Sequence, residues 1–413
     1  MDKKIVGVFG IILLLGLAMV FTFSNSTNNN EQLTYDQWSK VIQDAKESEE
    51  INIFIDSETD IDDFVLEQVI PTYEQKYNIK TNVEVGHWSG IQQSMINDKL
   101  GGRKEGKYDI VILSDEPMGR SMELNLIWGP IDIIQNYNDI EGIFLEGIQG
   151  IENEQEALTF AMDQYILVGN TKFLDRAYKE YPDNVTKLIQ WLVEQKSVRE
   201  GIDPGRLAIP APSRSNTGAA FIMLALLTVE NYQEYKMKPY DDSKSQKWLD
   251  SLNFIISDAP RAELEIEYMP ERLLDEEIFE KIQSGQFWIG YVRQDYAIRY
   301  LMNGENDHIT AYMPESGTMI SGIHAGITFN SQNKAAGLLF LELLLSEQTQ
   351  KEIANKEFRL PANKKISDEQ LSAEVVSSRA WVNRDEIRSE WLTWPHYQYK
   401  VELQALWRVM TSG

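Results

Sequence analysis

Residues 209–221 read IPAPSRSNTGAAF and join two segments of different character. A strand-like run at 206–209 stops at Pro210, and a helix-like apolar run follows at 219–229. Between them lie hydroxyls, an amide and a glycine. Ser, Thr and Asn are preferred helix caps, but the free N–H groups of a helix N-terminus also hold polar ligands. The stretch predicts a strand–loop–helix unit and leaves open whether the loop only caps the helix or also binds a ligand.

The alternation of strand and helix repeats outward from this unit in both directions. Before it, 51–55, 79–85 and 108–113 read as strands, with helix patterns at 61–77 and 91–100 between them. Pro71 is expected to end or bend the first of these helices. Further strands are expected at 159–168, 206–210, 287–292, from 309 and at 323–329, and helices at 184–195, 217–229, 243–257, 270–283 and 335–345. This order predicts an α/β fold with crossover connections.

The composition restricts the class of partner. The chain has 413 residues and a formal net charge of −25, without a basic stripe. Nucleic acid phosphates would repel such a surface, so no nucleic acid partner is expected. The chain has no cysteine. It therefore has no disulfide, no thiolate nucleophile, no cysteine-bound metal and no lipid attached through cysteine.

The N-terminus has the pattern of an export segment. Lys3 and Lys4 precede an uncharged, mostly apolar run at 5–23, and the polar sequence SNSTNNNEQ follows it. The run is longer than the core of an ordinary signal peptide and nearly long enough to span a bilayer. Residues 1–30 are therefore expected to be a cleaved signal or a membrane anchor with a polar tether, and the rest to lie outside the cytoplasm.

Polar clusters follow four of the expected strands: DSETD at 56–60, SDEPMGR at 114–120, the loop after Pro210, and VRQD at 292–295. In open α/β sheets, ligands bind beyond the carboxyl ends of the strands. Each cluster alone is also what a helix cap requires. Aromatic and basic residues near the same strand ends favour a ligand site, because aromatic faces hold flat or cationic groups and arginine holds carboxylates or phosphates. They are Trp88, Tyr165, Tyr268, Tyr291 and Arg293.

Patterns of catalysis are missing from the sequence. GHWSG at 86–90 has its serine in the fourth position, so it is no nucleophile elbow. The chain has neither H-E-x-x-H nor a phosphate-binding loop, and its four histidines are scattered. No catalytic residue, metal ligand or cofactor is predicted, and the chain is not expected to be an enzyme.

Three segments resemble the extracytoplasmic solute-binding proteins of ABC transporters. GKYDIVIL at 106–113 with its acidic loop, GRLAIPAPSRSNTGAAF at 205–221, and the segment from YMPESGT to SEQTQ at 312–350 carry the resemblance. It covers roughly residues 50–360. The nearest subgroup is that of the thiamine-like, spermidine/putrescine and iron-type binders with the type II periplasmic-binding-protein fold.

The resemblance implies an α/β, two-lobed fold with a ligand cleft between the lobes. Lobe 1 would comprise 35–163 plus 313–413, and lobe 2 would comprise 164–312. The positions that match the family's ligand contacts are Ser57, Glu58, Ser114, Asp115, Ser215, Thr217, Gly218 and Tyr291; Trp88, Tyr165 and Arg293 complete the predicted site.

Two departures from the family bear on the ligand. Iron-binding relatives commonly use adjacent tyrosines, and this chain has no Tyr-Tyr pair, which disfavours iron. The aromatic C-terminal segment is longer than the family leads us to expect, and its simplest interpretation is packing against lobe 1.

The resemblance implies that the chain captures a small polar or charged solute and delivers it to an ABC permease in the membrane, acting as a monomer. Acidic strand-end residues would balance a cation, while Arg293 and helix N-termini favour an anion, so an organic cation, a zwitterion and an anion all remain open. Two other classes of function also remain: a ligand-sensing module for a membrane partner, and an extracytoplasmic enzyme on the same scaffold.

Overall fold

The computed structural model describes residues 38–171, 205–210, 212, 215–229, 274–302, 308–312, 317–378, 380–381 and 391–411. These all belong to one unit, Gln37–Gly413, and that unit alone is considered below. The apolar run at 5–23, the helices expected at 184–195 and 243–257, and residues Ser213, Arg214 and Tyr268 lie outside the described residues.

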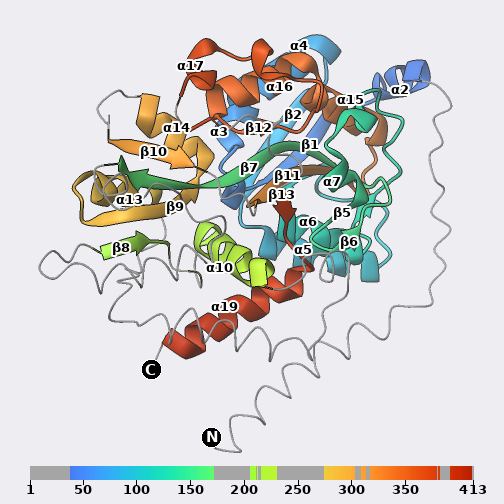
Figure 1. The fold of residues 1–413 in the computed structure, drawn as a ribbon. Coiled ribbons are helices and arrows are strands. Elements are labelled where there is room, and N and C mark those ends of the chain that lie inside the picture. The colour runs from blue at the N-terminus through green and yellow to red at the C-terminus, as the bar shows by residue number, and fades with distance from the viewer. Residues whose placement is uncertain are drawn as a thin grey trace, which may run out of the picture. The chain divides into compact units, whose positions relative to one another are not determined.

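A mixed sheet organises the unit, and its described part has 11 strands (Figure 1). Its main path runs β2 (Lys80–Gly86), β1 (Glu50–Asp56), β3 (Ile110–Ser114), β11 (Thr318–Thr328), β7 (Ala157–Asn170), β9 (Phe287–Arg293) and β8 (Gly205–Ala208). β1 pairs in parallel with β2 and β3, and β8 pairs in parallel with β9. Parallel pairs need crossover connections, as the strand–helix alternation of the sequence predicts.

Shorter strands complete the described structure: β4 (Ile127–Trp128), β5 (Gly147–Ile148), β6 (Ile151–Glu152), β10 (Ile309–Tyr312), β12 (Leu360–Pro361) and β13 (Trp391–Thr393). The α-helices are α2 (Trp38–Ala45), α3 (Asp62–Phe64), α4 (Ile70–Tyr77), α5 (Trp88–Leu100), α6 (Asp115–Glu123), α7 (Gly142–Glu146), α10 (Asn216–Val229), α13 (Leu274–Gln283), α14 (Gln294–Met302), α15 (Lys334–Leu345), α16 (Glu347–Glu352), α17 (Ala373–Val376) and α19 (Tyr397–Thr411).

Two antiparallel strands, β7 and β11, connect the two ends of the sheet. β11 pairs with β3 over Ile323–Ile327 and with β7 over Ile320–Gly326. β7 pairs with β12 at Ala161–Met162 and then, from Tyr165 onward, with β9. β7 therefore passes from the part of the sheet built on β1–β3 to the part built on β8 and β9, and Figure 1 shows it as the long green strand.

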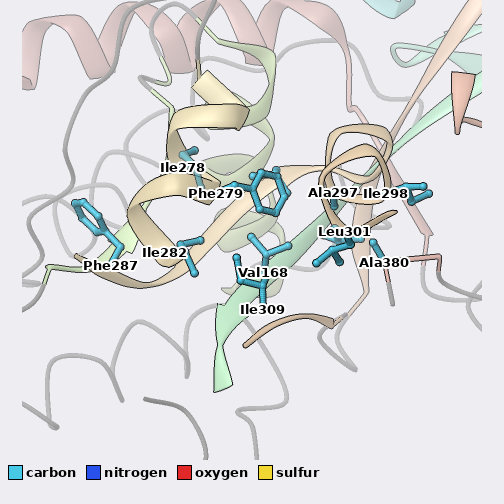
Figure 2. Close-up of a cluster of buried hydrophobic side chains, with 12 residues drawn as sticks. Val168, Ile278, Phe279, Ile282, Phe287, Ala297, Ile298, Leu301, Ile309 and Ala380 are labelled. Atoms are coloured by element: carbon cyan, nitrogen blue, oxygen red, sulfur yellow. The ribbon is translucent and has the colours of Figure 1, made fainter. Parts of the chain in front are cut away.

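Apolar side chains fill the space between the sheet and its helices. Figure 2 shows one cluster, in which residues of α13 and α14 pack on β7, β9 and β10; its members include Val168, Ile278, Phe279, Ile298 and Ile309. A second cluster packs α5 and α6 on β1 and β3 around Phe54, Trp88, Val111 and Met118. The place where β7 and β11 connect the β1–β3 part of the sheet to the β8–β9 part is called the strand crossing below. The first core lies on its β8–β9 side and the second on its β1–β3 side.

The expected elements that fall on described residues are present, with two informative differences. The helix expected at 61–77 contains a π-helical turn, Val65–Val69, just before Pro71. Proline removes a helical N–H and crowds the preceding turn, and a widened turn accommodates it. β11 begins at Thr318, five residues before the expected start at 323, because Thr318–Ile320 pairs with the distant β13.

Candidate functional site

Two tyrosines of the predicted site meet where β7 passes onto β9. The rings of Tyr165 and Tyr291 stack with centroids 5.9 Å apart and an interplanar angle of 19°. Phe221 of α10 meets the Tyr291 ring edge-on at 5.3 Å. Register explains the meeting, because Tyr165 is the partner of Arg293 in the β7–β9 pair, and Tyr291 lies two residues earlier on the same face. Three elements distant in sequence, β7, β9 and α10, thus each supply one ring to an aromatic cluster.

A chain of hydroxyl groups surrounds these rings. The Tyr165 hydroxyl lies 3.3 Å from Ser321 Oγ, and the Trp394 indole Nε1 donates to the same oxygen at 2.7 Å. The Tyr291 hydroxyl lies 3.4 Å from Thr318 Oγ1, and that threonine donates to the Tyr165 carbonyl. Burial raises the pKa of both tyrosines far above the usual range, so both hydroxyls stay neutral and can donate or accept.

Arg293 lies beside the tyrosines in a largely buried ion network. Its guanidinium donates to both carboxylate oxygens of Asp295, at 3.0 and 2.8 Å, and to Asp60 at 3.4 Å. Asp163 lies 4.0 Å from Arg293 and 3.1 Å from Arg359. Burial is the largest single influence on the pKa of Asp295 and raises it, but the charge and hydrogen bonds of Arg293, together with the charges of Arg359 and Arg299, outweigh burial and lower that pKa. A ligand anion would therefore compete with carboxylates already bound to Arg293.

Asp115 is tied to strand β11 rather than pointing freely from the start of α6. Its Oδ1 accepts from the Gly322 backbone N–H at 3.0 Å and lies 2.7 Å from His324 Nε2. His324 Nδ1 lies 2.8 Å from Thr159 Oγ1 on β7, and the imidazole is fully buried. The other oxygen, Oδ2, is buried with no hydrogen-bond partner among the described residues. The three side chains link the start of α6 to β11 and β7.

The strand end after β1 presents a buried carboxyl and an exposed one. Asp56 is 1% exposed, and its Oδ1 accepts from the Glu58 N–H at 3.4 Å. Burial, followed by the charge of Glu58, raises the pKa of Asp56 to about 6. Ser57 is half-buried and Glu58 is exposed, 3.8 Å from His87. This turn leads to Asp60, which reaches Arg293 across the strand crossing.

Trp88 and Ser114 have local roles in the structure. Trp88 is buried in the hydrophobic core against Phe54, with ring centroids 5.8 Å apart, and its Nε1 has no hydrogen-bond partner in the described part of the chain. Ser114 stands at the N-cap of α6 but its side chain makes no capping bond. That either residue contacts a ligand stays a prediction.

The loop before α10 does cap its helix. Ser215 Oγ accepts from the Gly218 N–H at 3.4 Å, and Thr217 is buried. A Cβ on Gly218 would lie 2.1 Å from the Pro210 carbonyl oxygen, so only glycine allows the strand end to approach the helix this closely. Capping and close packing explain these residues, and an additional contact with a ligand remains a prediction.

The structure thus brings Tyr165, Tyr291 and Arg293 together and connects them through β11 to Asp115. Ser321, Thr318 and Trp394 belong to the same group, although sequence reasoning missed them. Near the Arg293 network lies a narrow surface crevice that is too tight to admit a water molecule. Its lining includes Gln164 and Gln294, two buried amides that have no hydrogen-bond partner among the described residues.

The described residues offer neither a metal site nor a membrane-spanning helix. No group of three or more His, Cys, Asp or Glu side chains there is arranged to hold a metal ion. No helix within the described ranges has the length and apolar character needed to cross a membrane.

Comparison with known proteins identifies the fold. No protein-family model matches the chain, and no curated protein matches its sequence. Solved structures do match over most of its length. The Trichodesmium protein IdiA (FutA), in complex with iron and citrate ligands, is 14% identical with a TM-score of 0.59, covering 88% of this chain and 99% of that chain.

Two further solved structures match the chain over a similar share of its length. A protein from Bordetella parapertussis, assigned as an extracellular solute-binding protein, is 11% identical with a TM-score of 0.65, covering 88% of this chain and 99% of that one. A substrate-binding protein of an ABC transporter from Agrobacterium tumefaciens is 12% identical with a TM-score of 0.54, covering 88% of this chain and 94% of that one. The chain has the two-lobed α/β fold of these binding proteins. The predicted fold is confirmed.

Proposed function

We propose that this chain is the extracytoplasmic solute-binding component of an ABC importer. The observation that carries the proposal is the fold match along nearly the whole length of binding proteins, including one that serves an ABC transporter. Fold alone does not fix function, so the residues at the strand crossing supply the second support. The chain would capture a small solute between lobe 1, 35–163 plus 313–413, and lobe 2, 164–312.

The proposed cleft lies where β7 and β11 pass between the lobes. Its centre would be the Tyr165–Tyr291 stack with the hydroxyls of Thr318 and Ser321. Asp115 and the α10 loop, with Ser215, Thr217 and Gly218, would form its rims. Aromatic rings hold flat or cationic groups, and neutral hydroxyls orient polar atoms without adding charge. Both rings are buried in this structure, so a solute would reach them only when the cleft opens.

The charge balance at the crossing favours a solute with a positive group. Asp60, Asp163 and Asp295 share two arginines, Arg293 and Arg359, so the network has one surplus negative charge when all three carboxylates are ionised. Burial raises the pKa of Asp163, so a nearby positive group would favour this ionised form. An organic cation or a zwitterion would balance it, whereas an anion would have to displace Asp295 from Arg293. We therefore propose an organic amine or a zwitterion as the solute class, rather than iron.

The N-terminal segment bears on where the protein acts. Residues 1–30 would direct export and, if uncleaved, hold the protein at the membrane beside its permease. The protein would act as a monomer and carry out no reaction of its own. Soluble expression of residues 31–413 is the expected outcome, because 5–23 is the one apolar run of membrane length in the sequence.

A thermal-shift screen tests the function. The probes are spermidine, putrescine, thiamine, a zwitterionic betaine, a phosphonate and ferric citrate. A solute that binds only the folded state raises the apparent melting temperature in proportion to the logarithm of its concentration above Kd. We expect an amine or the betaine to raise it by several degrees. If no probe changes the melting temperature up to millimolar concentration, the proposed solute class is wrong.

A further inference from the structure

The C-terminal segment enters the place where a solute is expected. β13 (Trp391–Thr393) pairs in parallel with Thr318–Ile320 of β11. β3 pairs with β11 farther along, at Ile323–Ile327, and β7 occupies the opposite edge. β13 therefore lies in the sheet just beyond Ser114, the carboxyl end of β3. Open α/β folds bind their ligands beyond strand ends of this kind.

The residue after β13 makes a contact that an amine ligand would make. The Trp394 indole is 3% exposed, and its N–H donates to Ser321 Oγ at 2.7 Å. The same oxygen lies 3.3 Å from the Tyr165 hydroxyl. The ammonium group of Lys400 lies over the Trp394 ring, 5.4 Å from its centre. The Trp394 indole is a flat ring with an N–H donor, and it is already hydrogen-bonded to the Ser321 hydroxyl beside the tyrosine stack.

Helix α19, which follows Trp394 in the chain, anchors the C-terminal segment to the rest of the molecule. It contacts α6 and α10, helices of the two proposed lobes, as Figure 1 shows for the red helix at the C-terminus. Lys400 Nζ lies 3.0 Å from Glu116 in the first turn of α6, and the Tyr397 hydroxyl donates to Glu123 at 2.6 Å. Leu403 and Trp407 are fully buried. The anchoring of α19 is therefore extensive, whereas β13 has only three residues in the sheet.

We propose that residues 391–394 are a resident plug of the solute cleft, anchored by α19 and displaced when the solute binds. The inference rests on the proposed function and adds a form of regulation to the same site. A three-residue strand contributes few backbone hydrogen bonds, so it can leave while the buried face of α19 stays in place. A solute with an N–H donor on a flat or cationic group would take over the bond to Ser321.

If residues 391–394 block the cleft, a substitution that loosens them should strengthen solute binding, whereas a substitution of a ligand contact should weaken it. When only a fraction of molecules has an open cleft, the apparent Kd equals the intrinsic Kd divided by that fraction. Trp394→Phe removes the hydrogen bond to Ser321 but keeps an aromatic ring, so it should loosen the plug and tighten solute binding about three- to tenfold. Trp128→Phe, the same change at a tryptophan outside the segment, should leave affinity unchanged.

A reversible lock tests the displacement directly. Met319 and Leu392 are register partners on adjacent strands, whose spacing of about 5 Å allows a disulfide. Because the natural chain has no cysteine, Met319→Cys with Leu392→Cys can form one disulfide only. Binding of spermidine, thiamine and ferric citrate to the full chain is measured by calorimetry before and after reduction. The reduced form is the matched control for any structural effect of the substitutions.

For a probe that binds the reduced protein, we expect the oxidised protein to bind at least about 100-fold more weakly, with recovery after reduction. Equal affinity in both states would overturn the plug and leave the proposed function standing. Weaker binding by Trp394→Phe would likewise overturn it, since that result marks Trp394 as a fixed ligand contact.

Hydrogen exchange in the solute-free wild-type protein tests whether β13 opens locally, and it needs no ligand. The plug requires Leu392 and Thr393 to exchange at least about tenfold faster than the β11 amides bonded to β7, through an opening smaller than global unfolding. If both exchange together with β11, the segment is a fixed part of the sheet and the inference is wrong. Failure of every probe to bind, with fast exchange of β13, would count against the proposed function and not against the plug.

Discussion

Arg293 and Asp295 form a two-point ion pair at the junction of β9 and α14, with nitrogen–oxygen distances of 3.0 and 2.8 Å. The Arg293 side chain is 14% exposed and that of Asp295 is 4% exposed. The same guanidinium reaches Asp60, which lies in the other proposed lobe. A single side chain thus stabilises its own strand end and joins the two parts of the molecule.

Replacing Arg293 is expected to destabilise the fold. Arg293→Ala leaves Asp295 and Asp163 buried without a full counter-charge, and should lower the free energy of unfolding by about 2–4 kcal/mol. Lysine cannot reproduce the two-point geometry, so Arg293→Lys should recover only part of the loss. Urea denaturation measures both variants.

Arg299→Ala is the control for this prediction. The Arg299–Glu357 pair also joins the proposed lobes, at 3.2 Å, but Arg299 is 48% exposed. An exposed pair contributes about 1 kcal/mol or less. Equal losses for Arg293→Ala and Arg299→Ala would contradict the burial argument.

Asp56 predicts a specific pH dependence of stability. Its pKa in the folded protein is about 6, against an ordinary value near 4 when unfolded. Because the folded state binds this proton more tightly, its stabilising contribution is complete below pH 4 and is lost as pH rises through 6. Asp56→Asn lacks this loss, so its stability relative to wild type should increase by about 2–3 kcal/mol between pH 4 and pH 7.

Denaturation at several pH values checks this difference, and Asp63→Asn, at an exposed position near Asp56, is the matched control. A constant difference between Asp56→Asn and wild type across the range would show that burial does not shift this carboxyl.

Gly218→Ala tests the close approach of Pro210 to α10. The added Cβ would lie 2.1 Å from the Pro210 carbonyl oxygen, and we expect a loss of about 2 kcal/mol or more in unfolding free energy. A Cβ on Gly90, in helix α5, has open space around it. Gly90→Ala should therefore be neutral or stabilise by up to about 1 kcal/mol. Comparable effects at both glycines would contradict the packing account.

The double change Ser215→Ala with Thr217→Ala separates capping from ligand contact. Loss of the Ser215 cap should cost about 1 kcal/mol of stability. If the loop also touches the solute, affinity for a probe identified by the thermal-shift screen should weaken about tenfold. A lower melting temperature with unchanged affinity would mean that the loop only caps α10.

The sequence predicts most of the fold because the elements carry clear patterns. Continuous apolar runs such as Ile110–Leu113 mark buried parallel strands, and the glycine and hydroxyls before Ala219 mark a helix start. The extension of β11 back to Thr318 has no such mark. Its first residues become a strand because Trp391–Thr393 arrives from far along the chain to pair with them.

The candidate site is less predictable for the same reason. The sequence predicts that both Tyr165 and Tyr291 belong to the site, but only the register of β7 on β9 places their rings together. Ser321 and Trp394 give no local sign of their contact, since a serine in a strand and a tryptophan in an aromatic tail are ordinary residues. Arg293 is predicted as a site residue, but its neighbours in sequence do not show that Asp60, Asp163 and Asp295 surround it in the fold.

The most direct test of the account measures the distance between the two proposed lobes with and without solute. Ser94 on α5 and Glu280 on α13 are exposed, and the natural chain has no cysteine, so Ser94→Cys with Glu280→Cys accepts two spin labels and no others. Pulsed electron paramagnetic resonance then gives the distribution of distances between the labels. Hinge closure around a solute predicts a shorter and narrower distribution when a probe from the thermal-shift screen is bound. An unchanged distribution with that probe at saturation would contradict a solute cleft that closes between the lobes.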